Sequence, residues 1–202
     1  MVQLFVDGGG FMWPILFIFI IGFVFVGERL YHLVKGLASN EDFAMEVSST
    51  LEKSGTKAAQ DMCDQSMGPV ANLCSSALEK ADSGVEAVEK TLDQSGTIEM
   101  ASMEKNMTWI SLCIATAPML GFLGTVWGMI QAFNDIKMAN DISPAVVAGG
   151  ISVALLTTAF GLVVAVVLQI LQNAVMYIID NQIVTLQKSS IMILEAVEKK
   201  KK

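Results

Sequence analysis

The sequence predicts an all-α polytopic membrane protein with three transmembrane helices, of which the second and third are long and extend into the cytoplasm. Two observations support this fold class. Of the 202 residues, 53% are hydrophobic and only 16% are charged, and the mean hydropathy is +0.55. This balance is richer in apolar residues than that of ordinary soluble domains. The charges are also unevenly distributed, because they avoid three long stretches.

The first predicted span is residues 11–27, which contain no charged side chain and follow an external N-terminus, residues 1–10. With its flanking residues the stretch reaches the ~20 residues that cross a hydrocarbon core. A cleaved signal peptide is the alternative. It is disfavoured because the residues before the stretch include Asp7 but no Lys or Arg, and no Ala-x-Ala-like site follows.

Residues 28–105 hold fourteen of the twenty Asp and Glu, so we expect a water-exposed, cytoplasmic helical region. Apolar residues recur at helical spacing, which predicts a few short amphipathic helices rather than a sheet. The predicted turns between them are Ser54-Gly55, Gly68-Pro69, Ser83-Gly84 and Ser95-Gly96. The last segment, from about Thr97, reaches the second span without Gly or Pro, which predicts one helix running from water into lipid.

The second and third spans are predicted at residues 106–133 and 144–179, joined by an external loop at 134–143. No Asp, Glu, Lys, Arg or His occurs in residues 107–133 or 142–179. The third stretch is longer than a bilayer requires. Its helix is therefore expected to continue into water, toward the cytoplasmic tail at 180–202.

The distribution of basic residues predicts the orientation. Twelve of the thirteen Lys and Arg lie in segments 28–105 and 180–202, whereas the loop at 134–143 has only Lys137. The positive-inside rule places the basic segments and the C-terminus in the cytoplasm and the N-terminus outside.

Several functional classes are disfavoured by composition. The formal net charge of −7 argues against a nucleic-acid partner. The single His32 and three cysteines without a CxxC pair predict no metal site, and nothing indicates a cofactor. With no nucleophile beside a base and no phosphate-binding loop, we expect no enzymatic activity.

Small residues recur every three or four positions in the second and third spans. The stripes are Pro118, Gly121, Thr125, Gly128 and Ala132, with Gly124 paired to Gly128, and Gly150, Ala154, Thr158, Gly161 and Ala165. Small residues allow helix backbones to approach closely in lipid. The stripes predict tight helix packing, within a subunit or between copies.

The threonines Thr125, Thr157 and Thr158 have two interpretations. Each hydroxyl can bond a carbonyl one turn back in its own helix, without further role. Alternatively, some of them line a hydrated path, because a hydroxyl both donates and accepts hydrogen bonds. If protons cross here, another polypeptide must supply the titratable group, since neither span contains a carboxylate, His or Lys.

These two spans resemble a known family. Residues 114–133 (IATAPMLGFLGTVWGMIQAF) and 150–165 (GISVALLTTAFGLVVA) are similar to signatures of the ExbB/TolQ/MotA proton-channel family. With Glu28-Arg29 closing the first span, the resemblance covers the membrane part, about half of the chain. Three spans with one long cytoplasmic insertion resemble the ExbB/TolQ branch rather than the flagellar stator branch.

The resemblance implies a homo-oligomeric ring, a pentamer, in the inner membrane of a bacterial cell. Its second and third helices would surround an ExbD/TolR-like single-span partner whose intramembrane Asp carries protons. A TonB/TolA-like energy transducer is a further implied partner. The complex would use the proton motive force to drive envelope transport or related mechanical work. A partner-independent membrane channel or structural scaffold is the alternative function.

By position, the resemblance assigns a pore-lining role to Thr125 and Thr158, and we include the adjacent Thr157 in the predicted proton path. It assigns helix packing to Pro118, Gly121, Gly124 and Gly128. Many members of the family carry Glu where this sequence has Val153. Residues 28–105 contain no signature that separates nutrient uptake, envelope maintenance and gliding.

Overall fold

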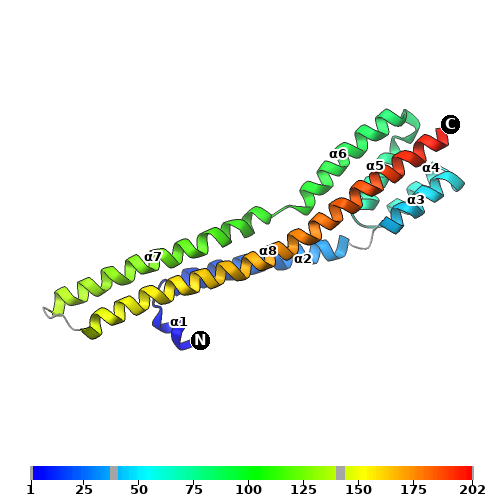
Figure 1. Ribbon diagram of the computed structural model, residues 1–202. Helices are drawn as coiled ribbons and strands as arrows, with labels where there is room; N and C mark the ends of the chain where they lie inside the picture. Colours follow the sequence, from blue (N-terminus) through cyan, green and yellow to red (C-terminus); the bar gives the residue numbers. More distant parts are fainter. Residues whose placement is uncertain (1, 37–40, 140–143, 202) are drawn as a thin grey trace. The chain divides into compact units, whose positions relative to one another are not determined.

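The computed structural model describes residues 2–36, 41–139 and 144–201, which form helices joined by turns and include no strand (Figure 1). The all-helical prediction is therefore confirmed. In chain order the elements are α1 (Val2–Asp7), α2 (Met12–Gly36), α3 (Glu41–Ser54), α4 (Thr56–Asp64), α5 (Pro69–Glu79), the 3₁₀ helix η1 (Ala81–Ser83), α6 (Val85–Met103), α7 (Met107–Ala139) and α8 (Pro144–Lys201).

The chain divides into two compact units, and α2 and α8 contribute to both. The membrane unit contains the residues up to Glu28 together with Asn106–Ala174. The helical domain contains Arg29–Lys105 together with the residues from Val175 onward.

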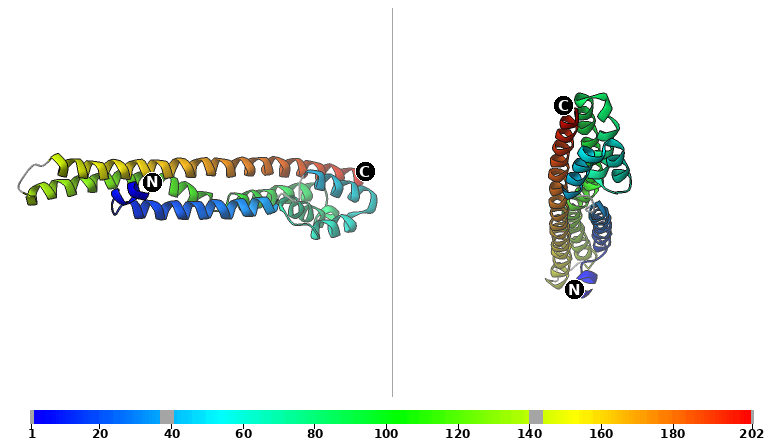
Figure 2. Two further views of the ribbon diagram at one scale, coloured as in Figure 1. Left: turned by 90° about the horizontal axis from the view of Figure 1, so that it is seen from below. Right: turned by 90° about the vertical axis from the view of Figure 1, so that its right-hand side faces the viewer.

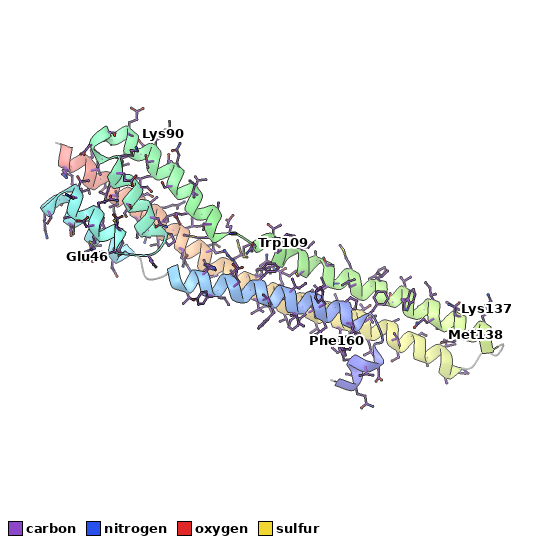
Figure 3. The ribbon with its side chains drawn as sticks, turned by 180° about the vertical axis from the view of Figure 1, so that it is seen from behind. Glu46, Lys90, Trp109, Lys137, Met138 and Phe160 are labelled. Carbon is purple, nitrogen blue, oxygen red and sulfur yellow. The ribbon has the colours of Figure 1, made fainter. Side chains whose placement is uncertain are left out.

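In the membrane unit, α2, α7 and α8 pack against one another. Their shared core consists of Ile15, Cys113, Ala117, Val164, Ala165 and Leu168. Gly22 of α2 allows the close approach, since a Cβ there would lie 2.7 Å from Leu168 Cδ1 and 3.3 Å from Cys113 Cβ. From the predicted external N-terminus, Phe5 of α1 packs edge-on against Trp13 and Phe160. Figure 3 shows Phe160 on α8.

The outer faces of these helices carry large apolar side chains. The exposed ones include Trp13, Phe17 and Phe23 of α2, Phe122, Trp127 and Phe133 of α7, and Leu155, Val163 and Ile170 of α8. Apolar surface of this extent requires a lipid or protein neighbour. Three stretches of the described chain, within Met12–Val34, Val85–Met138 and Val147–Lys200, are long and apolar enough to cross a membrane. This is the architecture of a multi-pass membrane protein.

The helical domain buries a core between α3, α4, α5, α6 and the C-terminal part of α8, which are drawn in two further views in Figure 2. Val47, Leu73, Val88 and Ile193 are fully buried there. The predicted turns at Gly55, Gly68 and Gly84 are confirmed. Each of these glycines has a positive φ and directly precedes a helix.

Two details of the sequence analysis were wrong. The turn predicted at Ser95-Gly96 lies inside α6, where Gly96 is buried and a Cβ would come within 3.9 Å of Leu73 Cδ1. This glycine thus lies on a buried face of a continuous helix and not in a turn. The continuous helix predicted from Thr97 into the second span is also interrupted. α6 ends at Met103 and α7 begins at Met107, because Asn106 adopts a left-handed backbone with φ of 65°.

The third helix is continuous, as predicted. α8 has 58 residues, which at ~1.5 Å per residue correspond to ~87 Å, about three times the thickness of a hydrocarbon core. Near its end, Lys199 Nζ lies 3.7 Å from Glu52 Oε1, and Lys200 Nζ donates to Thr56 Oγ1 at 2.7 Å. These two lysines of the basic tail thus contact α3 and α4. α7 continues to Ala139, so part of the predicted 134–143 loop is helical and residues 140–143 lie outside the described part.

Candidate functional site: the interface between α7 and α8

The small-residue stripes of the second and third spans meet in one interface within the protomer. Gly121 lies opposite Gly161, and Gly128 lies opposite Gly150. The order of these pairs shows that the two helices run antiparallel, as Figure 1 also shows. We call this interface the α7/α8 seam.

The backbones along the seam are too close for larger side chains. A Cβ on Gly161 would lie 2.7 Å from the carbonyl oxygen of Ala117, and one on Gly121 would lie 2.9 Å from that of Thr157. At the other end, a Cβ on Gly128 would lie 3.1 Å from the Gly150 carbonyl and 3.2 Å from the Ala154 nitrogen. A Cβ on Gly150 would collide with that of Ala132. These glycines therefore permit backbone contact between the helices.

Thr157 is fully buried in the seam. Its side chain fills the space left by Gly124, where a Cβ would lie only 2.6 Å from Thr157 Oγ1. The hydroxyl donates to the Ala154 carbonyl of its own helix at 2.8 Å. Thr157 therefore packs between two helices of one protomer and presents no hydroxyl to the surface of that protomer.

Thr158 differs from its neighbour. It is half-buried, and its hydroxyl donates across the seam to the Gly121 carbonyl of α7 at 3.4 Å. Gly121 is a suitable partner because the close approach at this position brings its backbone within reach. Thr125 is also half-buried, but its hydroxyl donates within its own helix, to the Phe122 carbonyl at 2.6 Å. Thr125 lies one turn from Gly121, on the same face of α7.

Pro118 lies within α7 and is half-buried. A proline has no N–H, so the carbonyl four residues earlier, that of Ile114, receives no helical hydrogen bond from this position. Pro118 is seven residues before Thr125 and seven after Ser111. These three residues therefore follow one stripe of α7, which drifts by only ~20° per heptad.

The sequence analysis missed a second polar contact between α7 and α8. Gln172 Nε2 of α8 donates to Ser111 Oγ of α7 at 2.6 Å. Gln172 lies two heptads beyond Thr158 on α8, so this contact lies on the same stripes as Thr158 and Thr125. The signal was present in the sequence, because Gln169, Gln172 and Asn173 interrupt an otherwise apolar stretch.

A groove of about 690 Å³ lies between α7 and α8 near the ends joined by residues 140–143. Its lining includes Gln131, Asp135 and Met138 of α7 and Gly149 and Val153 of α8. The groove therefore has a carboxylate from Asp135 on α7 and a branched apolar side chain at position 153.

The apolar part of the seam can position hydroxyl and amide groups, but it contains no carboxylate, imidazole or amine. The two apolar stretches at its centre, 107–133 and 142–179, contain no Asp, Glu, Lys, Arg or His. Hydroxyls and amides hold water and relay protons along hydrogen bonds only when a stronger acid or base is next to them.

Comparison with known proteins gives a consistent result. The model of the MotA/TolQ/ExbB proton channel family matches residues 65–188. A biopolymer transport protein ExbB homologue of Methanothermobacter thermautotrophicus is 32% identical over 183 residues, which cover 90% of this chain and 65% of the relative. An ExbB-like protein of Synechocystis is 27% identical over 80% of this chain and 65% of the relative.

The biopolymer transport protein ExbB of Xanthomonas campestris is 41% identical over 81 residues, which cover 40% of this chain and 32% of the relative. The chain thus spans about two thirds or less of the length of these relatives. The family model nevertheless matches more than half of the chain, including the segment from α5 to beyond the seam. The chain therefore belongs to the MotA/TolQ/ExbB proton channel family.

Proposed function

We propose that this chain is the channel subunit of a proton-driven motor in the inner membrane, with its C-terminus in the cytoplasm and its N-terminus outside. Copies of the chain, five in the family pattern, form a ring around an ExbD/TolR-like single-span partner. Proton flow past the partner's intramembrane Asp moves the partner inside the ring. A TonB/TolA-like transducer then carries the work to the envelope.

The proposal is based mainly on one observation. The Thr158 hydroxyl lies at the glycine-lined seam, half-buried and bonded to the backbone of the other helix, in a pair of apolar stretches, residues 107–133 and 142–179, without an Asp, Glu, His, Lys or Arg. Such a pair offers polar groups to a proton path but supplies no proton carrier. The chain thus complements a partner that contributes a carboxylate.

The heptad stripes support the same function. Thr125, Pro118 and Ser111 on α7, and Thr158, Ala165 and Gln172 on α8, each repeat every seven residues over 14 residues. At ~1.5 Å per residue each stripe covers ~21 Å, which is most of the hydrocarbon thickness. The hydroxyl and amide groups on these stripes can hold a chain of water molecules next to the partner's carboxylate.

The glycine seam has a supporting structural role in this proposal. Pro118, Gly121, Gly124, Gly128, Gly150, Ala154 and Gly161 fix α7 and α8 as one rigid pair, so the apolar side chains on the outer faces remain available for lipid and neighbouring copies. In this arrangement Thr157 holds the pair together, and Thr125 and Thr158 face the path.

The experiment is co-reconstitution into liposomes with a co-expressed single-span protein that carries an intramembrane Asp. Proton uptake is followed with a pH-sensitive dye under an imposed potential, and native mass spectrometry counts the subunits. We expect flux only when both proteins are present, and loss of flux when the partner Asp is changed to Asn. Flux from this chain alone would favour the partner-independent channel, and a complex without flux would favour a scaffold.

A further inference from the structure

The helical domain contains a pocket of about 250 Å³ that proton conduction does not use. Segments far apart in the sequence form it: the C-terminal part of α2, the turn before α5, the end of α6 and a residue of α8. Its polar lining residues are Arg29, His32, Asn72, Glu99, Ser102, Lys105 and Gln182. The volume is below that of most drug-sized ligand sites but is suitable for a small polar group.

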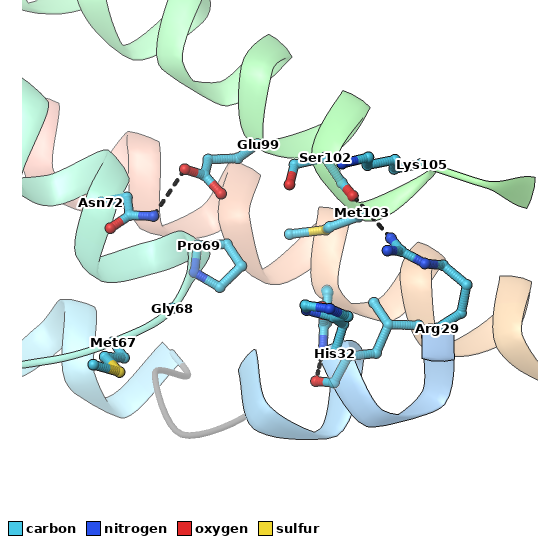
Figure 4. A pocket seen from close by; sticks show the side chains of 12 residues that line it. Arg29, His32, Met67, Gly68, Pro69, Asn72, Glu99, Ser102, Met103 and Lys105 are labelled. Carbon is cyan, nitrogen blue, oxygen red and sulfur yellow. Dashed lines mark hydrogen bonds between the residues drawn. The ribbon is translucent and has the colours of Figure 1, made fainter. Parts of the chain in front are cut away.

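The charged groups of the pocket favour an anion. Arg29 and Lys105 contribute two cations, and Glu99 contributes one carboxylate. The Glu99 carboxylate is engaged on one side, because Asn72 Nδ2 donates to its Oε1 at 2.9 Å (Figure 4). The pocket therefore has an excess of positive charge.

Arg29 is the central group of the pocket. Its side chain is only 4% exposed, and its Nη1 donates to the Ser102 carbonyl at 3.2 Å, in the last turn of α6 (Figure 4). This contact is favourable in itself, because cations stabilise the C-terminal end of a helix. A guanidinium carries five N–H donors in a planar fork, so it can hold a carbonyl oxygen and an oxyanion at the same time.

The surroundings provide further complementarity to an oxyanion. His32 also lines the pocket, and Lys105 contributes an exposed ammonium with three N–H donors. α5 begins at Pro69 beside the pocket without a side-chain cap, so its N-terminal backbone dipole adds a smaller favourable contribution. Leu33, Met67 and Met103 supply apolar walls.

We propose that this pocket binds a phosphate oxyanion, carried by an anionic lipid headgroup or by a small soluble phosphate. In the sequence, Arg29 lies two residues after the apolar stretch 11–27, and Lys105 lies two residues before the stretch 107–133. Arg29 thus follows one membrane-spanning segment and Lys105 precedes another. Lipid phosphates are found at the ends of such segments. The inference goes beyond the proposed function, because it requires neither the partner nor proton flux.

The test leaves the Arg29–Ser102 contact intact and changes the two opposing charges at the edge of the pocket. Lys105→Gln removes a cation and should weaken binding about fivefold, the factor that ~1 kcal/mol per basic residue produces. Glu99→Gln removes the repulsive carboxylate but keeps an oxygen that accepts from Asn72, so it should strengthen binding. Lys90→Gln and Glu89→Gln make the same charge changes at exposed positions of α6 outside the pocket and should have no effect.

The full chain is measured with two kinds of probe. Native mass spectrometry follows retention of phosphatidylglycerol against phosphatidylcholine from mixed micelles, and calorimetry follows inorganic phosphate and glycerol 3-phosphate. The expected pattern is weaker binding by Lys105→Gln, stronger binding by Glu99→Gln and no change in the two control variants. If this pattern is seen for phosphatidylglycerol but not for the soluble phosphates, the site binds a lipid headgroup. If it is seen for the soluble phosphates, the site binds a soluble ligand. Absence of binding by all probes overturns the proposal. It is equally overturned if Lys105→Gln and Lys90→Gln weaken binding alike, or if Glu99→Gln fails to strengthen it.

Discussion

The side-chain amide of Asn106 donates to the Glu28 carboxylate at 2.8 Å, and the backbone of Asn106 has a φ of 65°. Asparagine tolerates this left-handed conformation better than most residues. Its carbonyl accepts hydrogen bonds from Trp109 and Ile110 of the first turn of α7. Asn106 thus starts α7 and ties its beginning to α2.

Substitutions at Asn106 and Glu28 should separate two contributions to the free energy of unfolding, that of the left-handed backbone and that of the side-chain hydrogen bond. Asn106→Gly retains access to positive φ but loses the amide, so the free energy of unfolding should fall by about 1 kcal/mol. Asn106→Ala also loses the amide and, unlike Gly, keeps a Cβ in the left-handed region without the polar side chain that lets Asn tolerate it, so it should cost a further ~1–2 kcal/mol. Glu28→Gln keeps an accepting oxygen and should cost less than either. Thermal unfolding in detergent ranks the stabilities of the three variants. An Asn106→Ala variant as stable as Asn106→Gly would contradict the role given to the left-handed backbone of Asn106 in separating α6 from α7.

The second prediction concerns the seam and uses two adjacent glycines of α8. Gly150→Ala should destabilise the protein by about 1–3 kcal/mol, since its Cβ would collide with Ala132 and no shift of a flexible side chain relieves the contact. Gly149→Ala meets no atom within 4 Å and should be neutral or stabilise by up to ~1 kcal/mol through helix propensity.

Gly161→Ala is an independent variant at the opposite end of the seam and should behave like Gly150→Ala. Its Cβ would lie 2.7 Å from a backbone oxygen, that of Ala117. Thermal unfolding of the four proteins, including wild type, measures the effect. Equal stability of Gly149→Ala and Gly150→Ala would show that the two helices do not approach as closely as described.

The third prediction concerns topology, for which the native cysteines are poor reporters. Cys63 and Cys74 are 2% and 0% exposed, and each lies in the core of the helical domain. A hydrogen bond with Cys63 and burial raise the pKa of the Cys74 thiol, whereas the hydrogen bond with Cys74 lowers the pKa of Cys63. Because both sulfurs are buried, neither should react quickly with a bulky reagent from either side.

Introduced cysteines at exposed positions provide the test. Met138 lies at the end of α7 and is 87% exposed, and Lys90 is exposed on α6 (Figure 3). A membrane-impermeant maleimide added to intact cells should label Met138→Cys and leave Lys90→Cys unlabelled. Both should be labelled after the membrane is permeabilised. The reverse pattern in intact cells would contradict the proposed orientation.

The sequence was sufficient for the features that depend on local pattern. Long runs without charge predicted the three apolar helices, and the Gly-containing dipeptides at 55, 68 and 84 predicted helix boundaries. The stripes of Gly121, Gly128, Gly150 and Gly161 identified the faces on which α7 and α8 approach each other. Periodicity of 3.6 residues is enough to identify such faces.

The features that depend on tertiary contacts could not be predicted. The same dipeptide type at Ser95-Gly96 is helical, and Gly96 is buried inside α6. α6 ends at Met103 because Asn106, rather than a Gly or Pro, leaves the helical region. Thr157 and Thr158 are adjacent, so only the positions of Gly124 and Gly121 on the neighbouring helix show which hydroxyl is enclosed. The convergence of Arg29, Glu99 and Lys105 in one pocket likewise needs the folded domain.

The central claim is that Thr158 contributes its hydroxyl to a proton path formed with a partner carboxylate. Thr158→Val retains the branched shape but removes a donor and acceptor, which in a membrane core costs only about 0.6–2 kcal/mol of association. Assembly should therefore survive. Thr158→Ser restores the hydroxyl, and Thr157→Val is the matched control because Thr157 is enclosed within the protomer.

The most direct measurement is proton flux into liposomes that contain this chain and the proposed single-span partner, compared among these three variants and wild type at equal complex content. The account predicts that Thr158→Val lowers the flux by at least about tenfold, which corresponds to ~1.4 kcal/mol in the barrier. Thr158→Ser and Thr157→Val should retain most of it. Wild-type flux in Thr158→Val, or equal loss in Thr158→Val and Thr157→Val, would contradict the role assigned to Thr158.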